Sequence, residues 1–195
     1  GMLIGFGLLL FGIKQIADVA SLLNQGALLT NFFAGLEGKA FTALAIGAIA
    51  TVILQSSTAT LGIALSLAIS GSLPLSTACA IVLGANIGTT STAVFASMQA
   101  GEIAQRISFG HMAIKAVAAL GLLPFIGSIS KLLGELLPGA TDQIAYMHLG
   151  FNMICLVLLP VLTSLTKLLT KLIPDPPLAE NEFRIMATRP GKSCA

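Results

Sequence analysis

The sequence predicts an all-α, polytopic membrane protein that contains a re-entrant helical hairpin and a broken helix. Charged residues make up only 9% of the 195 residues, against ~25% in an average soluble domain, and hydrophobic residues make up 55%. No charged residue lies between Lys39 and Glu102, where short apolar runs alternate with uncharged polar patches. Such a composition cannot form the polar shell of a soluble protein. It also excludes disordered, disulfide-scaffold and nucleic-acid-binding classes.

The N-terminal segment is expected to be helical. Residues Met2 to Ile13 are apolar, and Ile13 to Leu23 continue with apolar positions at helical spacing around Lys14, Gln15 and Asp18. We expect the second part to be either the end of a first span or an interfacial helix. No basic region precedes the apolar run and no clear small-residue cleavage site follows it, so a signal peptide is not predicted.

Two short apolar arms predict the hairpin. Ala40 to Leu54 and Leu61 to Ile69 are apolar, and the polar run Gln55-Ser56-Ser57-Thr58 lies between them. Each arm is shorter than the ~20 residues that cross a bilayer. We therefore expect a helical hairpin whose polar tip lies inside the membrane, where protein or a wet cavity must surround it. A single continuous helix with a polar stripe is the alternative.

The broken helix is expected between Leu75 and Met98. That apolar run is interrupted by Gly84-Ala85-Asn86-Ile87-Gly88-Thr89-Thr90. The two glycines, four residues apart, also fit a small-residue helix-packing pattern. Packing alone does not explain an Asn flanked by glycines and followed by hydroxyl residues. We therefore expect a break at this point, with freed backbone carbonyls facing a cavity.

Two further spans are expected, Ile107 to Ile129 and Gln143 to Leu165, with a loop from Lys131 to Asp142 between them. Each span carries a His followed four residues later by a polar side chain, and each later contains a Leu-Pro pair. A polar tail begins at Pro174. We expect it to be flexible or to be the start of a soluble domain.

The hairpin tip is the first candidate site. Gln55, Ser56, Ser57 and Thr58 bring amide and hydroxyl groups into an apolar, uncharged setting, where an unpaired polar group costs free energy. A single Ser or Thr would be explained by hydrogen bonds to its own helix or to a neighbour. A run that begins with Gln at a hairpin tip favours a binding site instead.

The second candidate site comprises Asn86, Thr89 and Thr90. Freed carbonyls and hydroxyls suit a hard cation such as Na⁺, while exposed helix N-termini suit an anion. No Lys or Arg in Ala40 to Gly101 can neutralise an anion there. Neutralisation would then come from bound cations, helix dipoles and backbone N–H groups, unless another segment supplies charge.

A third candidate is the pair His111 and Lys115, together with His148 and Asn152, at the same spacing on the other span. We interpret these as hydrogen-bonded pairs that hold helices together, in preference to a proton relay, with Lys115 snorkelling to an interface. The sequence shows no protease, P-loop or paired-carboxylate arrangement, and its cysteines have no metal-ligand spacing. An enzyme and a metal site are therefore not predicted.

The chain resembles the type II sodium–phosphate cotransporter family, in its bacterial branch. The resemblance rests on the run from Gln55 to Thr60, the run from Gly84 to Thr90 and the spacing between them, and it covers Met2 to Ile173. The helices of His111 and of His148-x-x-Phe151-Asn152 agree with later spans of the family. Two positions depart from the family pattern, since Thr58 stands where Ser is frequent and Lys115 where Asn is usual.

The resemblance implies Na⁺-coupled transport of inorganic phosphate, with no cofactor besides the coupling ion. Members of this family contain two such hairpins, in inverted repeats that face each other around one site. By this resemblance, phosphate or Na⁺ would contact Gln55, Ser56, Ser57 and Thr58 at the tip, with Asn86, Thr89 and Thr90 lining the same site. For Na⁺, the candidate ligands are Gln55, Ser56, Ser57, Thr89 and Thr90.

Only one such hairpin is present, and the later spans resemble the second repeat. We therefore expect residues 1–173 to be a partial membrane transport domain, one half of an inverted-repeat transporter, that needs a second repeat-half or a second copy. Residues 174–195 form the tail. The cytoplasmic (inner) membrane is the expected location, with the tail in the cytoplasm by the positive-inside rule. That rule compares Arg106, Lys167, Lys171, Arg184, Arg189 and Lys192 with Lys39 and Lys131.

Two other functions are compatible with the same residues. A non-transporting membrane subunit involved in phosphate signalling would fit the short chain and polar tail. A carrier or channel for another small ion would use the same polar hairpin. Phosphate flux measured with and without Na⁺ distinguishes all three.

Overall fold

A computed structural model describes residues 2–24, 31, 33 and 35–174 of the chain. All regular structure within these ranges is helical, which confirms the predicted all-α class. Residues 175–195, which make up nearly all of the predicted tail, lie outside the described residues. The helices are α1 (Met2–Asn24), α3 (Ala40–Leu54), α4 (Ser57–Ile69), α5 (Leu75–Ser97), α6 (Glu102–Leu122), η1 (Leu123–Phe125, a 3₁₀ turn), α7 (Ile126–Leu136), α8 (Ala140–Val157) and α9 (Val161–Leu172).

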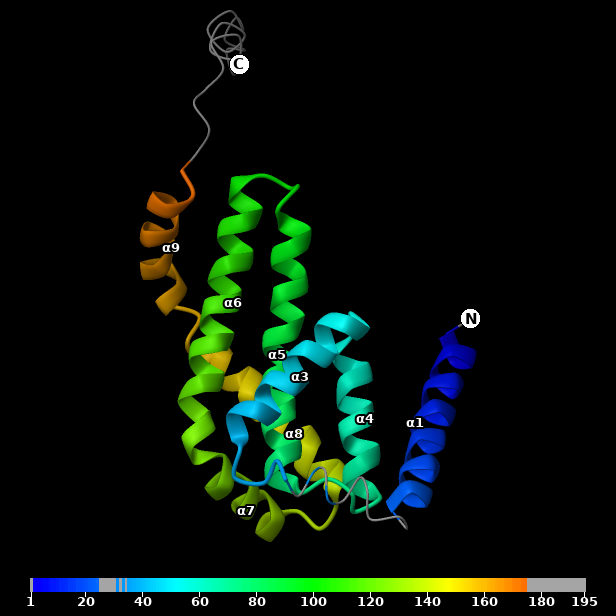
Figure 1. Ribbon diagram of the computed structural model, residues 1–195. Helices are drawn as coiled ribbons and strands as arrows, with labels where there is room; N and C mark the ends of the chain where they lie inside the picture. Colours follow the sequence, from blue (N-terminus) through cyan, green and yellow to red (C-terminus); the bar gives the residue numbers. More distant parts are fainter. Residues whose placement is uncertain (1, 25–30, 32, 34, 175–195) are drawn as a thin grey trace, which may run out of the picture.

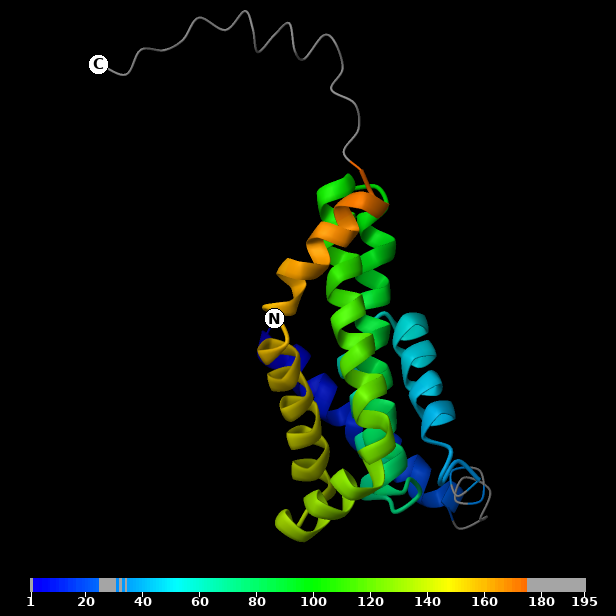
Figure 2. The ribbon, with the colours of Figure 1, turned by 90° about the vertical axis from the view of Figure 1, so that its left-hand side faces the viewer.

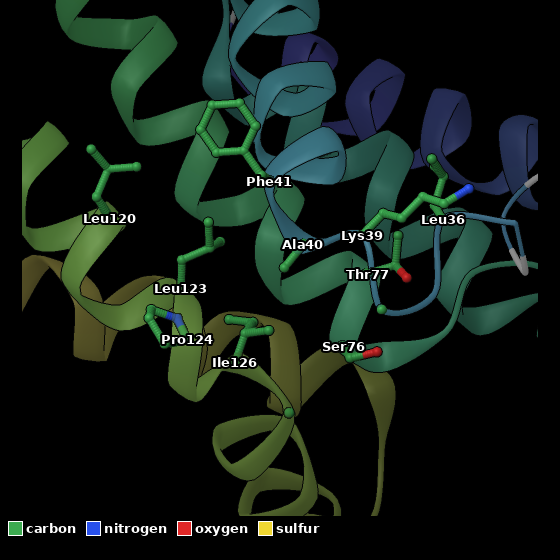
Figure 3. A pocket seen from close by; sticks show the side chains of 12 residues that line it. Leu36, Lys39, Ala40, Phe41, Ser76, Thr77, Leu120, Leu123, Pro124 and Ile126 are labelled. Atoms are coloured by element: carbon green, nitrogen blue, oxygen red, sulfur yellow. The ribbon is translucent and has the colours of Figure 1, made fainter.

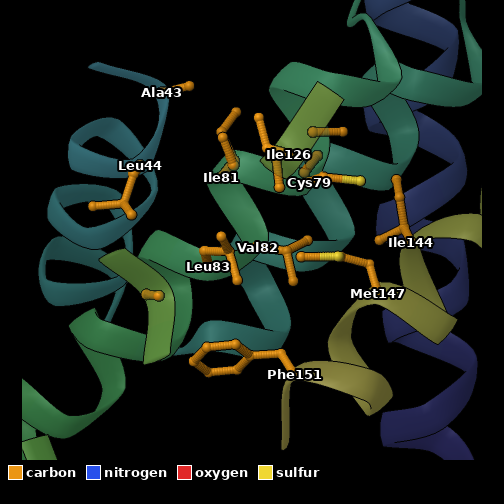
Figure 4. Packing of buried hydrophobic residues seen from close by; sticks show 14 of the residues in the cluster. Ala43, Leu44, Cys79, Ile81, Val82, Leu83, Ile126, Ile144, Met147 and Phe151 are labelled. Atoms are coloured by element: carbon orange, nitrogen blue, oxygen red, sulfur yellow. The ribbon is translucent and has the colours of Figure 1, made fainter. Parts of the chain in front are cut away.

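Helix α5 is the centre of the fold. Helices α3, α4, α6, α7 and α8 all pack against it. It runs antiparallel to α6, and the two form the longest part of the molecule (Figures 1 and 2). Every α5 residue from Thr77 to Asn86 is buried. Figure 4 shows the apolar core around this segment, where Leu83 lies between Leu44 of α3 and Phe151 of α8, and Val82 lies near Met147.

Helices α3 and α4 form the predicted hairpin. The chain reverses at Gln55, whose backbone is left-handed (φ 52°, ψ 25°), and Ser56 begins the next helix. The open end of the hairpin lies at the end of the molecule where α5 begins, and the tip lies part-way along α5 and α6 (Figures 1 and 2). The alternative of one continuous helix with a polar stripe is therefore wrong.

The predicted break between Gly84 and Thr90 is also wrong, because α5 is continuous from Leu75 to Ser97. The glycines serve close packing instead. A Cβ atom at Gly84 would overlap the carbonyl oxygen of Leu44, and one at Gly47 would overlap that of Ile81. Small residues on both helices therefore allow the α3 and α5 backbones to approach closely.

Prolines break the later segments. Pro124 lies in η1, where the helical direction changes between α6 and α7, and Pro160 separates α8 from α9. Proline lacks an N–H donor, and its ring clashes with the preceding turn of a helix. Both spans predicted as single helices are thus divided. The predicted loop from Lys131 is helical as far as Leu136, and the connection to α8 is only Leu137–Gly139.

Among the described residues, two helical segments are long and apolar enough to cross a membrane, Leu75–Ser97 and Glu102–Leu136. Shorter apolar helices are Met2–Gly12, Ala40–Leu54 and Ser57–Ile69. Large apolar side chains on the outside of the bundle, such as Phe41 and Val157, are exposed. Extensive apolar surface of this kind is expected to contact lipid or another protein segment.

We expect Gly84→Ala to lower the free energy of unfolding by ~1–3 kcal/mol, because the added methyl group forces α3 away from α5. The matched control is Gly150→Ala on α8, where a Cβ atom meets nothing within 4 Å. That change should leave stability unchanged or raise it slightly through helix propensity. Unfolding of the detergent-solubilised protein measures both. Equal stability of Gly84→Ala and the parent would contradict the close α3–α5 contact.

Candidate functional site

The hairpin tip is held by its own hydrogen bonds. The Ser56 hydroxyl accepts from the Ala59 N–H at 3.2 Å, which caps the N-terminus of α4. Behind it, the Thr51 hydroxyl donates to the Thr60 hydroxyl at 2.9 Å, and Thr60 in turn donates to the Ser56 carbonyl at 3.2 Å. Thr51 and Thr60 are both buried. This chain of bonds joins the two arms and fixes the backbone on which the tip side chains stand.

Three polar side chains of the tip are left without a hydrogen bond in the described part of the chain: Gln55, Ser57 and Thr58. Gln55 and Thr58 are exposed, and Ser57 is half-buried. The C-terminus of α3 and the N-terminus of α4 meet here. The last carbonyls of a helix favour a cation and the first N–H groups of a helix favour an anion. The tip can therefore offer ligands for ions of both signs.

A second polar cluster, the Asn86 cluster, joins α5, α6 and α8. It consists of Asn86, Lys115, His148 and Asn152. The Lys115 ammonium donates to Asn86 Oδ1 at 3.0 Å, and Asn152 Nδ2 donates to the same oxygen at 3.5 Å. Asn86 Nδ2 donates to the Val82 carbonyl at 2.9 Å and lies 3.3 Å from His148 Nδ1. One carboxamide on the central helix thus connects three helices.

The partners of Asn86 are also joined to each other on α8. Asn152 Nδ2 donates to the His148 carbonyl at 2.8 Å and lies 3.3 Å from His148 Nε2. The interpretation of His148 and Asn152 as a hydrogen-bonded pair that holds helices together is therefore confirmed. For Lys115 the expectation of snorkelling is wrong, because its side chain is 8% exposed and reaches α5 instead of an interface.

A cavity of about 440 Å³ lies beside this cluster, between α6 and α8. Its polar lining is His111, Lys115 and Asn152, and Cys155 also lines it. His111 itself is exposed, and it forms no hydrogen bond within the described ranges. His111 and Lys115 therefore do not act as a hydrogen-bonded pair; they line one cavity. The remaining lining is apolar: Ile107, Ile114, Leu156 and Leu159.

The hydroxyls of Thr89 and Thr90, in the second candidate site, donate hydrogen bonds to carbonyls of their own helix. Thr89 donates to the Ala85 carbonyl at 2.9 Å and Thr90 to the Ile87 carbonyl at 2.8 Å. Since α5 is unbroken, no carbonyl is freed for a ligand at this point. Thr89 is exposed and Thr90 is buried. Each hydroxyl oxygen keeps acceptor capacity, but these residues do not form the predicted cavity.

The structure thus divides the predicted residues into three groups, one of which is Thr89 and Thr90 on α5. Gln55, Ser56, Ser57 and Thr58 lie at the tip, while Asn86 lies in a separate cluster whose other members come from α6 and α8. Within the described part of the chain, no hydrogen bond joins the tip side chains to that cluster. Sequence reasoning missed the role of Lys115. The available signal was a Lys within an apolar span, far from any carboxylate in sequence.

A larger cavity, of about 540 Å³, lies at the open end of the hairpin (Figure 3). Leu120, Leu123 and Pro124 line one side of it, and Lys39 and Thr77 lie on the other. The Thr77 hydroxyl is buried and has no hydrogen-bond partner among the described residues. None of the predicted site residues lines this cavity.

Comparison with known proteins decides the family. The sequence profile of the Na⁺/Pi-cotransporter family matches residues 8–159. The chain belongs to the Na⁺/Pi-cotransporter family. Together with its long apolar helices, membership indicates a membrane protein. The resemblance stated from the tip and Asn86 motifs is therefore confirmed.

Several curated relatives of this Na⁺/Pi-cotransporter family chain are similar to it. A protein of Bacillus subtilis named "Uncharacterized protein YqeW" is 30% identical over 155 residues, which is 80% of this chain and 50% of the relative. The "Putative inorganic phosphate export protein YjbB" of Escherichia coli K12 is 28% identical over 182 residues, 93% of this chain and 34% of the relative. The "Sodium-dependent phosphate transport protein 2A" of Ovis aries is 38% identical over 94 residues, 48% of this chain and 13% of the relative.

The chain spans half or less of the length of these relatives. No solved structure matches it.

We expect Asn86→Leu to lower the free energy of unfolding by ~2–3 kcal/mol, because it removes the acceptor of a buried ammonium. Replacing both partners, in Asn86→Leu/Lys115→Met, should restore much of the loss, since no buried charge is then left unpaired. A double-mutant cycle by denaturant unfolding in detergent measures the coupling. Additive losses in the double variant would show that the two side chains do not interact.

Proposed function

We propose that this chain forms one half of a Na⁺-coupled transporter of inorganic phosphate in the cytoplasmic (inner) membrane. The observation that carries the proposal is the helical hairpin whose tip presents three polar side chains without internal partners. Family membership supports it. The names of two relatives, a putative phosphate exporter and a sodium-dependent phosphate transport protein, supply the substrate and the coupling ion that we extend to this chain.

The hairpin is re-entrant in this proposal. At 1.5 Å rise per residue, its arms of 15 and 13 residues are about 22 and 20 Å long. Neither crosses a hydrocarbon core of ~30 Å, whereas the 23 residues of α5 extend about 35 Å and do. The tip therefore ends inside the membrane. Its polar groups need a wet cavity or a protein wall around them.

Phosphate and Na⁺ bind at the tip. The Gln55 amide and the Ser57 and Thr58 hydroxyls donate to phosphate oxygens, and the N–H groups at the start of α4 favour the anion. Na⁺ takes oxygen ligands from Gln55, Ser56 and Ser57 near the C-terminus of α3. The unbroken α5 offers the hydroxyl oxygens of Thr89 and Thr90 in place of freed carbonyls, whereas the carboxamide of Asn86 is engaged in its own cluster.

A second repeat-half, or a second copy, completes the site. The tip side chains Gln55 and Thr58 are exposed on this half alone, and a polar group that faces lipid costs several kcal/mol. An inverted partner would cover that side with a second hairpin. Both phosphate and Na⁺ would then be enclosed between two tips.

We expect Gln55→Gly to abolish Na⁺-dependent phosphate flux without loss of folding. Glycine accepts the left-handed backbone of this position, so the change removes only the amide. The measurement is flux of ³²P-labelled phosphate by the intact protein in liposomes, with Na⁺ or choline outside. The control is Ser130→Ala on α7, whose hydroxyl bonds to the Gly127 carbonyl of its own helix. Parent-like flux in Gln55→Gly would remove the tip from the site.

The same assay separates the alternatives. A phosphate-signalling subunit would show no flux in the parent protein, and a channel for another ion would conduct without phosphate. Ser56→Ala is a poorer probe than Gln55→Gly, because loss of the α4 cap alone costs ~1 kcal/mol of stability.

We also expect the C-terminal tail to be cytoplasmic. Arg106 Nε donates to the Ile173 carbonyl at 2.8 Å, and the beginning of α6 and the end of α9 lie at one end of the molecule (Figure 1). Lys39 directly precedes α3 and Lys131 lies on α7, and the beginning of α3 and α7 both lie toward the other end (Figure 1). The end richer in Lys and Arg, with the tail charges, should face the cytoplasm.

Labelling with an impermeant thiol reagent checks this orientation. Cys194 in the tail should react only after the cells are permeabilised, while a cysteine introduced as Lys39→Cys should react in intact cells. Cys79 and Cys155 are buried, so the background is low. Labelling of Cys194 from outside intact cells would reverse the proposed orientation.

A further inference from the structure

We propose that Lys115 provides a fixed positive charge for an oxyanion bound in the cavity between α6 and α8, so that this site needs no Na⁺ for neutralisation. The site is separate from the hairpin tip. Only the identity of the anion, inorganic phosphate, rests on the proposed function. Three features of the structure support this role: the position of Lys115, its lack of an acidic partner among the described residues and the chemistry of the cavity walls.

The position of Lys115 is unusual for a lysine. Helices α3, α4 and α5 carry no charged residue, and on α8 the acidic Asp142 lies in the first turn. On α6, Glu102 precedes Lys115 by 13 residues, about 20 Å along the helix axis. Lys115 thus lies well inside α6, and the two helices that share its polar cluster, α5 and α8, carry no charge other than Asp142. Its side chain is only 8% exposed.

The ammonium is only partly satisfied. It has three N–H donors, and its one hydrogen bond within the described chain goes to a neutral oxygen, Asn86 Oδ1. No described carboxylate contacts it. A buried ion is normally paired with an opposite charge, because the desolvation of an isolated ion costs several kcal/mol. A bound anion would supply the missing partner and accept the two remaining donors.

The neighbouring cavity has the chemistry that an oxyanion requires. Its volume of about 440 Å³ exceeds the size of a tetrahedral oxyanion, and its polar walls are the Lys115 ammonium, the His111 imidazole and the Asn152 amide. All three can donate hydrogen bonds, and none of the described residues that line the cavity is acidic. The other walls are apolar, and a low dielectric strengthens the attraction between an ammonium and an anion.

Other titratable groups near Lys115 do not compete for this role. His148 faces the cluster from α8 and is engaged with Asn86 and Asn152. Cys155 lines the cavity as a buried thiol. Asn86 Oδ1 already accepts hydrogen bonds from Lys115 and Asn152, so it is not available as an oxygen ligand for Na⁺. The α6–α8 cavity therefore neutralises a bound anion with the Lys115 ammonium, whereas the tip would neutralise it with a bound cation.

Equilibrium binding of ³²P-labelled phosphate to the intact, detergent-solubilised protein tests the proposal. In Na⁺-free choline buffer, the parent should bind phosphate, and Lys115→Met should weaken binding by at least ~10-fold. Lys115→Arg keeps the charge and should stay within a few-fold of the parent. Gln55→Gly should keep Na⁺-free binding, because the tip is a separate site. Where Lys115→Met alone does not fold, Asn86→Leu/Lys115→Met replaces it, since the double change leaves no unpaired buried partner.

The outcomes separate this inference from the proposed function. Absence of Na⁺-free binding by the parent, or parent-like binding by a folded variant with Met at position 115, would overturn the inference even if Na⁺-dependent flux is present. Conversely, Na⁺-free binding that depends on Lys115, in a protein without Na⁺-dependent flux, would support the inference and reject the proposed function.

Discussion

The close contact between α3 and α5 is the constraint on which the rest of the structure depends. Gly47 and Gly84 let the two backbones meet, and one turn further on Thr51 lies against Gly88. This contact places the end of α3 beside the middle of α5, and the Thr51–Thr60 bond then joins α4 to α3. The hairpin must therefore turn at Gln55, part-way along the central helix. The position of the polar tip along α5 follows from a packing requirement among small residues.

The same packing explains which features could be predicted from the sequence. The hairpin was predictable because two arms too short to cross a membrane leave few other arrangements for Gln55 and its neighbours. The break at Gly84 was predicted wrongly because glycine serves both helix breaking and close helix packing, and only the facing residue, Leu44, distinguishes the two. The divisions at Pro124 and Pro160 were available from the sequence, since proline acts locally.

Prediction of the candidate site failed where contacts are distant in sequence. Asn86 was identified, but its contact with Lys115 crosses 29 residues and depends on the rotation of α6 about its axis. The i, i+4 pairing of His111 with Lys115 indicated a local pair, whereas tertiary packing directs Lys115 toward α5. By contrast, His148 and Asn152 do bond within their own helix, as their spacing implied. Residue spacing in the sequence predicts hydrogen bonds within one helix, but it does not predict hydrogen bonds between helices.

The two polar regions differ in how they would neutralise an anion. At the tip, the neutral groups of Gln55 and Ser57 leave charge compensation to a bound cation and helix ends. At the α6–α8 cavity, the ammonium of Lys115 is covalently fixed. Under the proposed function, a bound Na⁺ would cross the membrane and be released, so a tenfold Na⁺ gradient would contribute ~1.4 kcal/mol per ion. A fixed ammonium is never released, so it neutralises an anion without drawing on a gradient. A transporter that neutralises phosphate with both Na⁺ and a fixed ammonium would couple fewer Na⁺ ions to each phosphate than one that relies on Na⁺ alone. A smaller opposing gradient of phosphate would then suffice to reverse the direction of transport.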